Sequence, residues 1–187
     1  MSFAPCIPSS IATPFGIVHL HAFKKENHRE HIREVLCAAA GGDVGCIVAK
    51  EGVRPYFTNS PFDANWTHSA KLCVLAYSGE AIVGVDAERI RSRSTRVADR
   101  FFNAEEAAHI NRCEPEAAMQ EFFKLWCRKE AYYKCVGGSF FKDSLEVNML
   151  DGFPNGVFCA EWTVEFENER YQVTLAATSR ATRLQKD

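Results

Sequence analysis

The most regular pattern of apolar and polar positions in this sequence lies between Phe122 and Val136. Leu125 and Trp126 follow Phe122 by three and four positions, Tyr133 follows Trp126 by seven, and Val136 follows Tyr133 by three. These are the spacings of one face of an α-helix. Because start and stop signals flank the segment, we expect one long helix that opens at Glu114-Pro115 and ends at Gly137-Gly138.

A carboxylate and an ammonium stand one turn apart on this predicted helix. Trp126, Glu130 and Lys134 are successive i, i+4 neighbours, so their side chains lie along one line. Two interpretations are open. Glu130 and Lys134 can form a surface ion pair worth about 0.2–0.5 kcal/mol, or they can belong to a functional site. For Trp126, packing in the core and contact with a ligand are the corresponding alternatives.

The segment Ile82–Glu88 reads as a buried strand, because apolar β-branched residues run up to Asp86 after a turn-like Ser-Gly-Glu. Side chains alternate across a strand, so Asp86 and Glu88 project from one face, roughly 7 Å apart. That spacing would let them share one hard cation. Gly84 lies on the same face, where we expect room for a ligand. The alternative is an ordinary strand end at which charges begin because solvent begins.

The remaining pattern predicts short strands and helices in alternation. Residues 1–14 are expected to be irregular, and the polar tail 179–187 is expected to fray. The predicted strands are 15–23, 46–49, 72–77, 81–87, 145–150, 161–166 and 171–178. We expect hairpins between 72–77 and 81–87 and between the last two strands. The other predicted helices are 24–40, with its inward face at Ile32, Val35, Leu36 and Ala39, a short one ending near Phe102, and one capped by Asn103.

Composition narrows the class of protein. A chain of 187 residues with 47% apolar residues can build a full core. The formal net charge of −2 gives no basic field for nucleic acid or an anionic membrane, and no apolar run is long enough for a membrane span. The N-terminus lacks the pattern of a signal peptide. The eight cysteines never form C-x-x-C, which favours reduced thiols and a cytoplasmic protein.

Several ordered segments together resemble one family. GVDAE at 84–88, followed by WCRKEAYYK at 126–134, is similar to G-[IV]-D-x-E and W-x-x-K-E-[AS]-x-x-K of the 4′-phosphopantetheinyl transferases. Three further segments resemble the longer, surfactin-synthetase-activating type. They are Arg54-Pro55-Tyr56 for Lys-Pro-Tyr, residues 65–69 for Asn-x-Ser-His-Ser, and Arg100-Phe101-Phe102 with Glu106 for Arg-Phe-Phe…Glu. The similarity extends from about Arg54 to Val147, half the chain, and more weakly from His28.

The resemblance implies an α+β fold made of two pseudo-symmetric halves of mixed sheet plus helices, the 4′-phosphopantetheinyl transferase fold. Residues 1–80 would form the half that contacts the adenine and 3′-phosphate of coenzyme A. Residues 81–187 would carry the metal and the catalytic motifs, with the ligand in the cleft between the halves. A monomer is implied for the longer type.

The implied activity is Mg²⁺-dependent transfer of 4′-phosphopantetheine from coenzyme A to a serine of an apo acyl, polyketide or peptidyl carrier protein, with release of 3′,5′-ADP. The sequence does not distinguish the carrier or Mg²⁺ from Mn²⁺. One alternative is a non-catalytic module of the same fold that binds coenzyme A or a carrier protein. Another is a different metal-dependent phosphotransferase or pyrophosphatase.

The resemblance also assigns roles to individual residues. Asp86, Glu88 and Glu130 would be the Mg²⁺ ligands, Glu88 in some relatives through water. Lys134 would neutralise a phosphate. Glu106 would position or deprotonate the incoming serine, with a capping box around Asn103 as the equal alternative.

Coenzyme A contacts are implied for a further set of residues. Arg54 and Pro55 would lie at the adenine end, where Arg54 replaces the usual lysine. For Lys129 and Arg29 the alternative is that they are solvated surface charges. The residues that bind the 3′-phosphate are the least defined part of the site. The implied phosphate contacts are Thr67, His68, Ser69, Lys129, Lys134 and Arg29.

Overall fold

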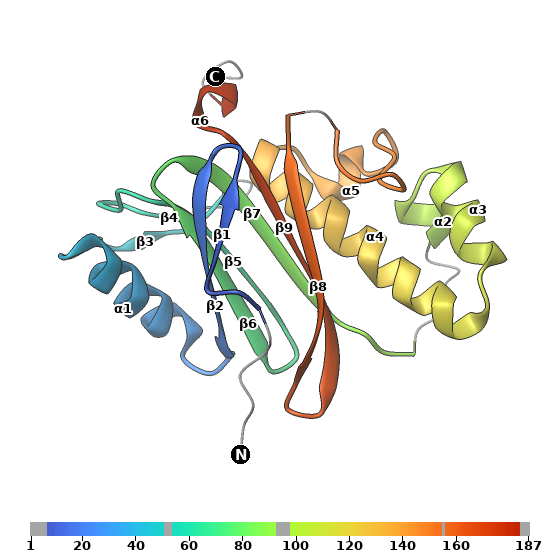
Figure 1. The fold of residues 1–187 in the computed structure, drawn as a ribbon, viewed down its shortest axis with the longest axis horizontal. Coiled ribbons are helices and arrows are strands. Elements are labelled where there is room, and N and C mark those ends of the chain that lie inside the picture. The colour runs from blue at the N-terminus through green and yellow to red at the C-terminus, as the bar shows by residue number, and fades with distance from the viewer. Residues whose placement is uncertain (1–6, 51–53, 93–97, 155, 184–187) are drawn as a thin grey trace.

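The computed structural model describes residues 7–50, 54–92, 98–154 and 156–183. Its strands form two larger antiparallel sheets and one small one (Figure 1). The four-stranded sheet has the order β1 (Ser10–Thr13), β2 (Gly16–Lys24), β6 (Leu72–Ser78) and β5 (Asp63–Ser69). The three-stranded sheet has the order β7 (Ala81–Arg89), β9 (Glu169–Ser179) and β8 (Phe158–Phe166). β3 (Ile47–Val48) pairs with β4 (Tyr56–Phe57).

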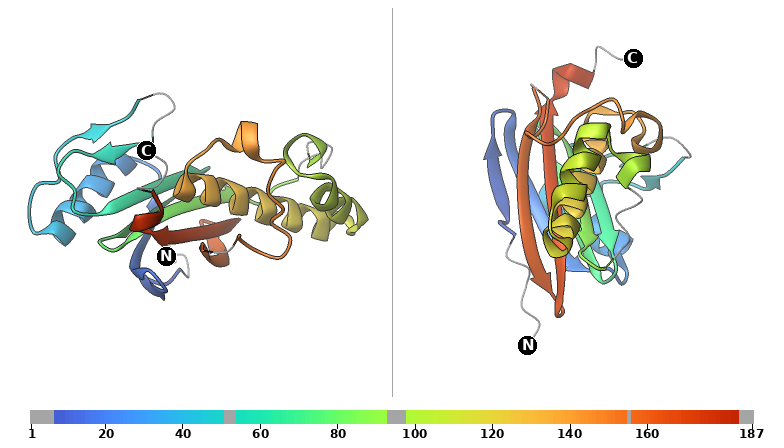
Figure 2. Two further views of the ribbon diagram at one scale, coloured as in Figure 1. Left: turned by 90° about the horizontal axis from the view of Figure 1, so that it is seen from above. Right: turned by 90° about the vertical axis from the view of Figure 1, so that its right-hand side faces the viewer.

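The helices cover the outer faces of the two larger sheets. α1 (His28–Ala40) lies on the four-stranded sheet and α4 (Pro115–Val136) lies on the three-stranded sheet, at opposite sides of the molecule (Figures 1 and 2). The shorter helices flank α4 or close the chain: α2 (Ala98–Phe101), α3 (Ala104–Arg112), α5 (Phe140–Asp143) and α6 (Arg180–Arg183). The result is a layered α+β architecture.

Alternating side chains of β6 and β7 hold these layers together. Every residue of β6 is buried, because even-numbered residues such as Val74 face the other sheet while odd-numbered ones such as Leu75 face α1. On β7, Val83 and Val85 enter the core between the sheets, whereas Ile82 packs against α4. A strand covered on both faces reads as a continuous apolar run, which both segments have.

The predicted hairpin between residues 72–77 and 81–87 is wrong. β6 pairs with β2 and β5, while β7 pairs with β9, so the chain crosses from one sheet to the other at Gly79 and Glu80. Ser78 fixes the crossing, because its hydroxyl donates to the Ile17 carbonyl and accepts from the Ala81 amide. The turn signal was correct, but the strands on its two sides pair within different sheets.

Most other elements are confirmed. The helix capped by Asn103, the long helix from Pro115 and the hairpin of β8 and β9 are all present. α1 buries Ile32 and Leu36 as expected, although Ala39, predicted to face inward, is exposed.

Several segments differ from expectation, and β4 and β5 lie where no strand was predicted. β1 lies in the lead-in expected to be irregular, where it pairs with β2. Residues 145–150 form turns and irregular chain instead of a strand. Their main chain is held by side chains from α3 and α4, as described below, and not by a neighbouring strand. Residues 1–6, 93–97 and 184–187, parts of the predicted lead-in, arginine-rich linker and tail, lie outside the described residues.

Gly84 does not leave room for a ligand, contrary to the expectation from its face of the strand. A Cβ at this position would collide with the Ala131 carbonyl oxygen and lie 2.6 Å from the Cys135 amide nitrogen. The backbone of α4 therefore occupies the space above Gly84, and this close approach brings the polar side of α4 to Asp86.

Replacing Gly84 with alanine should lower the free energy of unfolding by about 1–3 kcal/mol, because helix backbone cannot give way as a flexible side chain would. Urea denaturation would measure the loss. Gly42→Ala is the matched control, since nothing lies within 4 Å of a Cβ there. Equal stability of the two variants would contradict the close packing of α4 on β7.

Candidate active site

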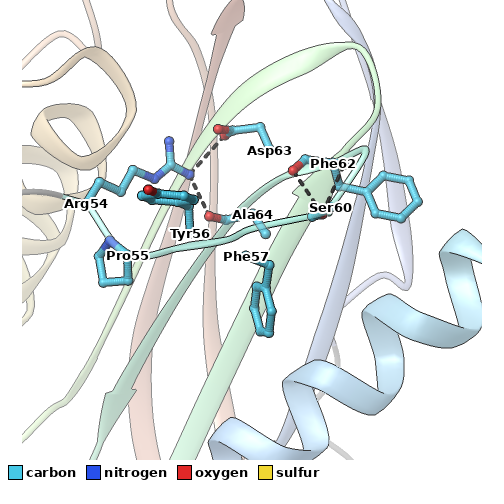
Figure 3. A pocket seen from close by; sticks show the side chains of 8 residues that line it. All are labelled: Arg54, Pro55, Tyr56, Phe57, Ser60, Phe62, Asp63 and Ala64. Carbon is cyan, nitrogen blue, oxygen red and sulfur yellow. Dashed lines mark hydrogen bonds and ion pairs between the residues drawn. The ribbon is translucent and has the colours of Figure 1, made fainter. Parts of the chain in front are cut away.

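A cleft of about 840 Å³ lies between β5, the C-terminal half of α4 and the segment leading into α5. This volume is in the usual range for small-molecule sites. Arg54 and Pro55 line it and also line a smaller adjoining cavity of about 320 Å³ (Figure 3). The remaining residues of the cleft wall are Asn65, Trp66, Glu130, Tyr133, Lys134, Gly137, Gly138, Ser139, Phe140, Lys142 and Asp143. The segment Arg54-Pro55 and the segment Glu130–Lys134, which are far apart in the sequence, therefore meet at one cleft.

Asp86 is the most enclosed charged group of this region, with 4% of its surface exposed. Its Oδ1 accepts a hydrogen bond from Lys134 Nζ at 2.6 Å and another from Thr67 Oγ1 at 3.1 Å. Its Oδ2 is buried and accepts no hydrogen bond of normal geometry among the described residues, while the buried Cys127 thiol lies beside the carboxylate. A buried carboxylate oxygen without a partner is costly, so this atom marks a place for a cationic or donor ligand.

Glu88 and Glu130 share an electrostatic site with Asp86. Burial, and next the charge of Asp86, raise the pKa of Glu88, while the Ser69 hydroxyl donates to its Oε2 at 2.8 Å. Burial raises the pKa of Glu130 to about 7; Lys134 opposes this, whereas Asp86 and Glu88 add to it. Because carboxylates shift one another only at short range, the three groups lie near a common region.

These carboxylates are not arranged as a complete set of metal ligands in the structure. Within the described ranges, no group of three or more His, Cys, Asp or Glu side chains converges as metal ligands. The Lys134 ammonium takes the place of a counter-cation at Asp86. The donor set nevertheless fits a hard dication, since it consists of carboxylate oxygens, one of them unpartnered.

The cationic side of the cleft region comes from three elements. His68 lies at the end of β5, edge to face with His28 of α1 at a centroid distance of 5.1 Å. Burial, and then the charges of Lys25, His28 and Lys134, lower the pKa of His68. Arg29, also predicted to contact coenzyme A, is exposed on α1. A phosphate near His68 would thus meet several positive groups.

Arg54 is fixed in the wall by its guanidinium. One terminal nitrogen donates to Asp63 Oδ2 at 2.9 Å and to the Ala64 carbonyl at 3.0 Å (Figure 3). The same nitrogen donates to the Val83 carbonyl at 2.6 Å. The residue links β5 to β7 and at the same time lines both cavities.

Glu106 and Lys129 lie away from the cleft. Both side chains are fully buried and form an ion pair of 2.8 Å. Glu106 completes the predicted capping box with Asn103 and also accepts from the Met149 amide. Lys129 donates to the carbonyls of Ser144 and Val147. In this arrangement both side chains bind protein groups in the interior, and neither is among the residues that line the cleft.

Sequence reasoning missed the role of Arg128 and the contacts that β5 makes with β7. Arg128 makes a two-pronged ion pair with Glu161 and donates to the carbonyls of Met149 and Leu150, which anchors the irregular segment 145–150. The polar side chains at alternate positions of β5, namely Asp63, Asn65, Thr67 and Ser69, all point at β7. The alternation itself was the available signal.

The comparison with known families now decides the classification. Residues 82–176, which carry Asp86, Glu88, Glu130 and Lys134, match the family model described as the 4′-phosphopantetheinyl transferase superfamily. The chain belongs to the 4′-phosphopantetheinyl transferase superfamily. Among curated members of this superfamily, the 4′-phosphopantetheinyl transferase AcpT of Salmonella typhi is 33% identical over 95 residues, 50% of either chain.

Two Bacillus-type members of the superfamily are also similar. The 4′-phosphopantetheinyl transferase of Bacillus subtilis is 29% identical over 138 residues, 68% of this chain and 61% of that one. The transferase gsp of Aneurinibacillus migulanus is 32% identical over 81 residues, 43% and 34% of the two chains. This superfamily member spans about half the length of the first relatives it matches. No helix in its described part is long and apolar enough to cross a membrane.

Proposed function

We propose that this protein transfers the 4′-phosphopantetheine group from coenzyme A to a serine of an apo carrier protein and releases 3′,5′-ADP. The observation that carries the proposal is the meeting of Lys134 with Asp86, close to Glu88 and Glu130, beside a cleft of about 840 Å³. Membership in the superfamily, whose similar members bear this name, supports it.

The reaction is a phosphoryl transfer. The serine oxygen forms a bond to the β-phosphorus of coenzyme A, the serine proton leaves, and the bond to the bridging oxygen of 3′,5′-ADP breaks. Such a reaction needs neutralised phosphates and a positioned nucleophile more than it needs covalent work by the enzyme. In our proposal Lys134 supplies positive charge at the cleft, His68 offers a ring nitrogen to a phosphate near α1, and Arg54 with Pro55 borders the adenine end.

Asp86, Glu88 and Glu130 would hold the metal ion, for which we propose Mg²⁺. Bound there, the ion would neutralise charge on the diphosphate of coenzyme A. Lys134 pairs with Asp86 in the structure, and in our proposal it would turn toward a phosphate once a dication balances that carboxylate. Thr67 and Ser69, which the resemblance places at the phosphates, hydrogen-bond to the carboxylates in the structure.

Further parts of the proposal concern the whole molecule. We propose that residues 1–80 supply the nucleotide side of the site and residues 81–187 the metal side, as two similar halves. The protein would act as a monomer in the cytoplasm, on an acyl, polyketide or peptidyl carrier protein.

Intact mass spectrometry tests the activity directly. The protein is incubated with coenzyme A, Mg²⁺ and a small panel of apo carriers, and at least one carrier should gain the mass of one phosphopantetheine. Omission of Mg²⁺ with added EDTA should stop the gain. If calorimetry finds coenzyme A bound while no carrier in the panel is modified, the non-catalytic binding module is the better description.

A further inference from the structure

The edges of the two large sheets are joined by side chains along β5. No main-chain ladder connects β5 with β7, because β5 pairs with β6 and β7 pairs with β9. Instead, Asp63 Oδ2 accepts from the Val83 amide at 2.8 Å and Asn65 Oδ1 accepts from the Val85 amide at 2.8 Å. Side-chain oxygens thus take the role that main-chain carbonyls of a paired strand would have.

Farther along β5, the side chains of this row bind carboxylates of β7 and not only its main-chain amides. Thr67 Oγ1 donates to Asp86 Oδ1 at 3.1 Å, and Ser69 Oγ donates to Glu88 Oε2 at 2.8 Å. Ser69 Oγ also accepts from the Arg89 amide at 3.0 Å, which orients its proton toward Glu88. Each of the two strand carboxylates is therefore held by one hydroxyl from the facing strand.

Strand alternation separates these hydroxyls from His68. Thr67 and Ser69 project toward β7, whereas His68 projects from the opposite face, where its ring meets His28. The three neighbouring polar residues cannot all converge on one phosphate. Thr67 is buried as well, with 8% of its surface exposed, so its hydroxyl serves Asp86 and not a ligand in the cleft.

We propose that Thr67 and Ser69 are positioning residues, which orient Asp86 and Glu88 so that a free carboxylate oxygen faces a divalent cation. At Asp86 the hydroxyl and Lys134 both bind Oδ1, and the buried Oδ2 is left without a partner. Groups that hold metal ligands in this way commonly change metal affinity 10–100-fold when they are removed. The inference rests on the proposed function, because that function supplies the cation.

The test replaces each hydroxyl and measures metal binding, not only turnover. Mn²⁺ binding to the whole protein, alone and with coenzyme A, is followed by electron paramagnetic resonance. Thr67→Val and Ser69→Ala should each weaken Mn²⁺ binding about tenfold or more. Thr67→Ser, which retains the hydroxyl, should restore it. The KM for coenzyme A at saturating Mn²⁺ should stay within about twofold of the parent, because no phosphate contact is lost.

Ser78→Ala is the matched control, because it also removes a buried hydroxyl next to β7, at the crossing and away from the carboxylates. It should affect stability and leave Mn²⁺ affinity unchanged. Unaltered Mn²⁺ affinity in both Thr67→Val and Ser69→Ala, or a raised coenzyme A dissociation constant measured in EDTA, would overturn the positioning role. In either case the parent protein would still modify carriers. A parent that binds no Mn²⁺ and modifies no carrier would overturn the proposed function itself.

Discussion

Glu130→Gln is expected to lower the rate of phosphopantetheine transfer by roughly 1000-fold or more, while the protein remains folded. Glutamine keeps the size of the side chain but removes its charge, so one of the three carboxylates that we propose as metal ligands is lost. A loss of about 4 kcal/mol of transition-state stabilisation corresponds to such a factor. Single-turnover assays read by mass spectrometry would measure it.

A glutamate on the same helix provides the control. Glu121→Gln removes a carboxylate that pairs with Lys124 and His109 far from the cleft, and surface pairs of this kind contribute little. It should transfer at the parental rate. If Glu130→Gln were folded and equally active, the assignment of Glu130 to the metal site would be wrong.

The pH dependence of stability gives a second readout for Glu130 in metal-free buffer. Its pKa in the folded protein is raised, mainly by burial, from 4.5 to about 7, so the unfolded chain is the first to release this proton as pH rises. The folded state therefore loses stability between about pH 4.5 and pH 7. Glu130→Gln should remove this loss and be more stable than the parent at pH 8 in EDTA, as measured by thermal unfolding.

The second large effect is expected at the buried pair of Lys129 and Glu106. Lys129→Met leaves Glu106 without a counter-charge in a fully buried position, which should lower the free energy of unfolding by about 3–5 kcal/mol. Adding Glu106→Gln should recover part of the loss, because the buried charge disappears. Urea denaturation of the single and double variants would give the coupling between the two side chains.

The same variants separate a structural role from a catalytic one. Arg33→Met, which breaks the exposed pair with Asp43, serves as the control and should cost less than about 1 kcal/mol. If Glu106→Gln alone were as stable as the parent but had lost transfer, with Mn²⁺ and coenzyme A still bound, Glu106 would act on the serine after all. We expect the opposite result for Glu106→Gln: the free energy of unfolding should fall, and any loss of transfer should follow from that loss of stability.

The local sequence pattern was sufficient to predict the elements whose stabilising contacts are between residues close in sequence. The spacing of apolar residues located α4, and the capping box at Asn103 needed only the residue three positions later, Glu106. The β8–β9 hairpin turns at Glu167 and Asn168, both in the left-handed region with φ of 49° and 64°. In each case the deciding contacts are short-range.

The sequence pattern did not predict contacts between residues that are far apart in the sequence. The burial of Lys129 depends on Glu106 and on the carbonyls of residues 144 and 147, which no periodicity connects. One signal was present, since Lys129 lies three positions after Trp126 and four before Tyr133, within the apolar face of α4. Similarly, the occupation of the space above Gly84 by α4 follows from tertiary packing alone.

The short crossing at Gly79 and Glu80 has a thermodynamic consequence. Because the strands before and after the crossing contribute to one shared apolar core, cutting the chain there would leave each fragment with an exposed apolar surface. The two pieces should then aggregate or recombine, and neither should persist as an autonomous module. Although the molecule can be drawn as two sheets, we expect it to melt as a single cooperative unit.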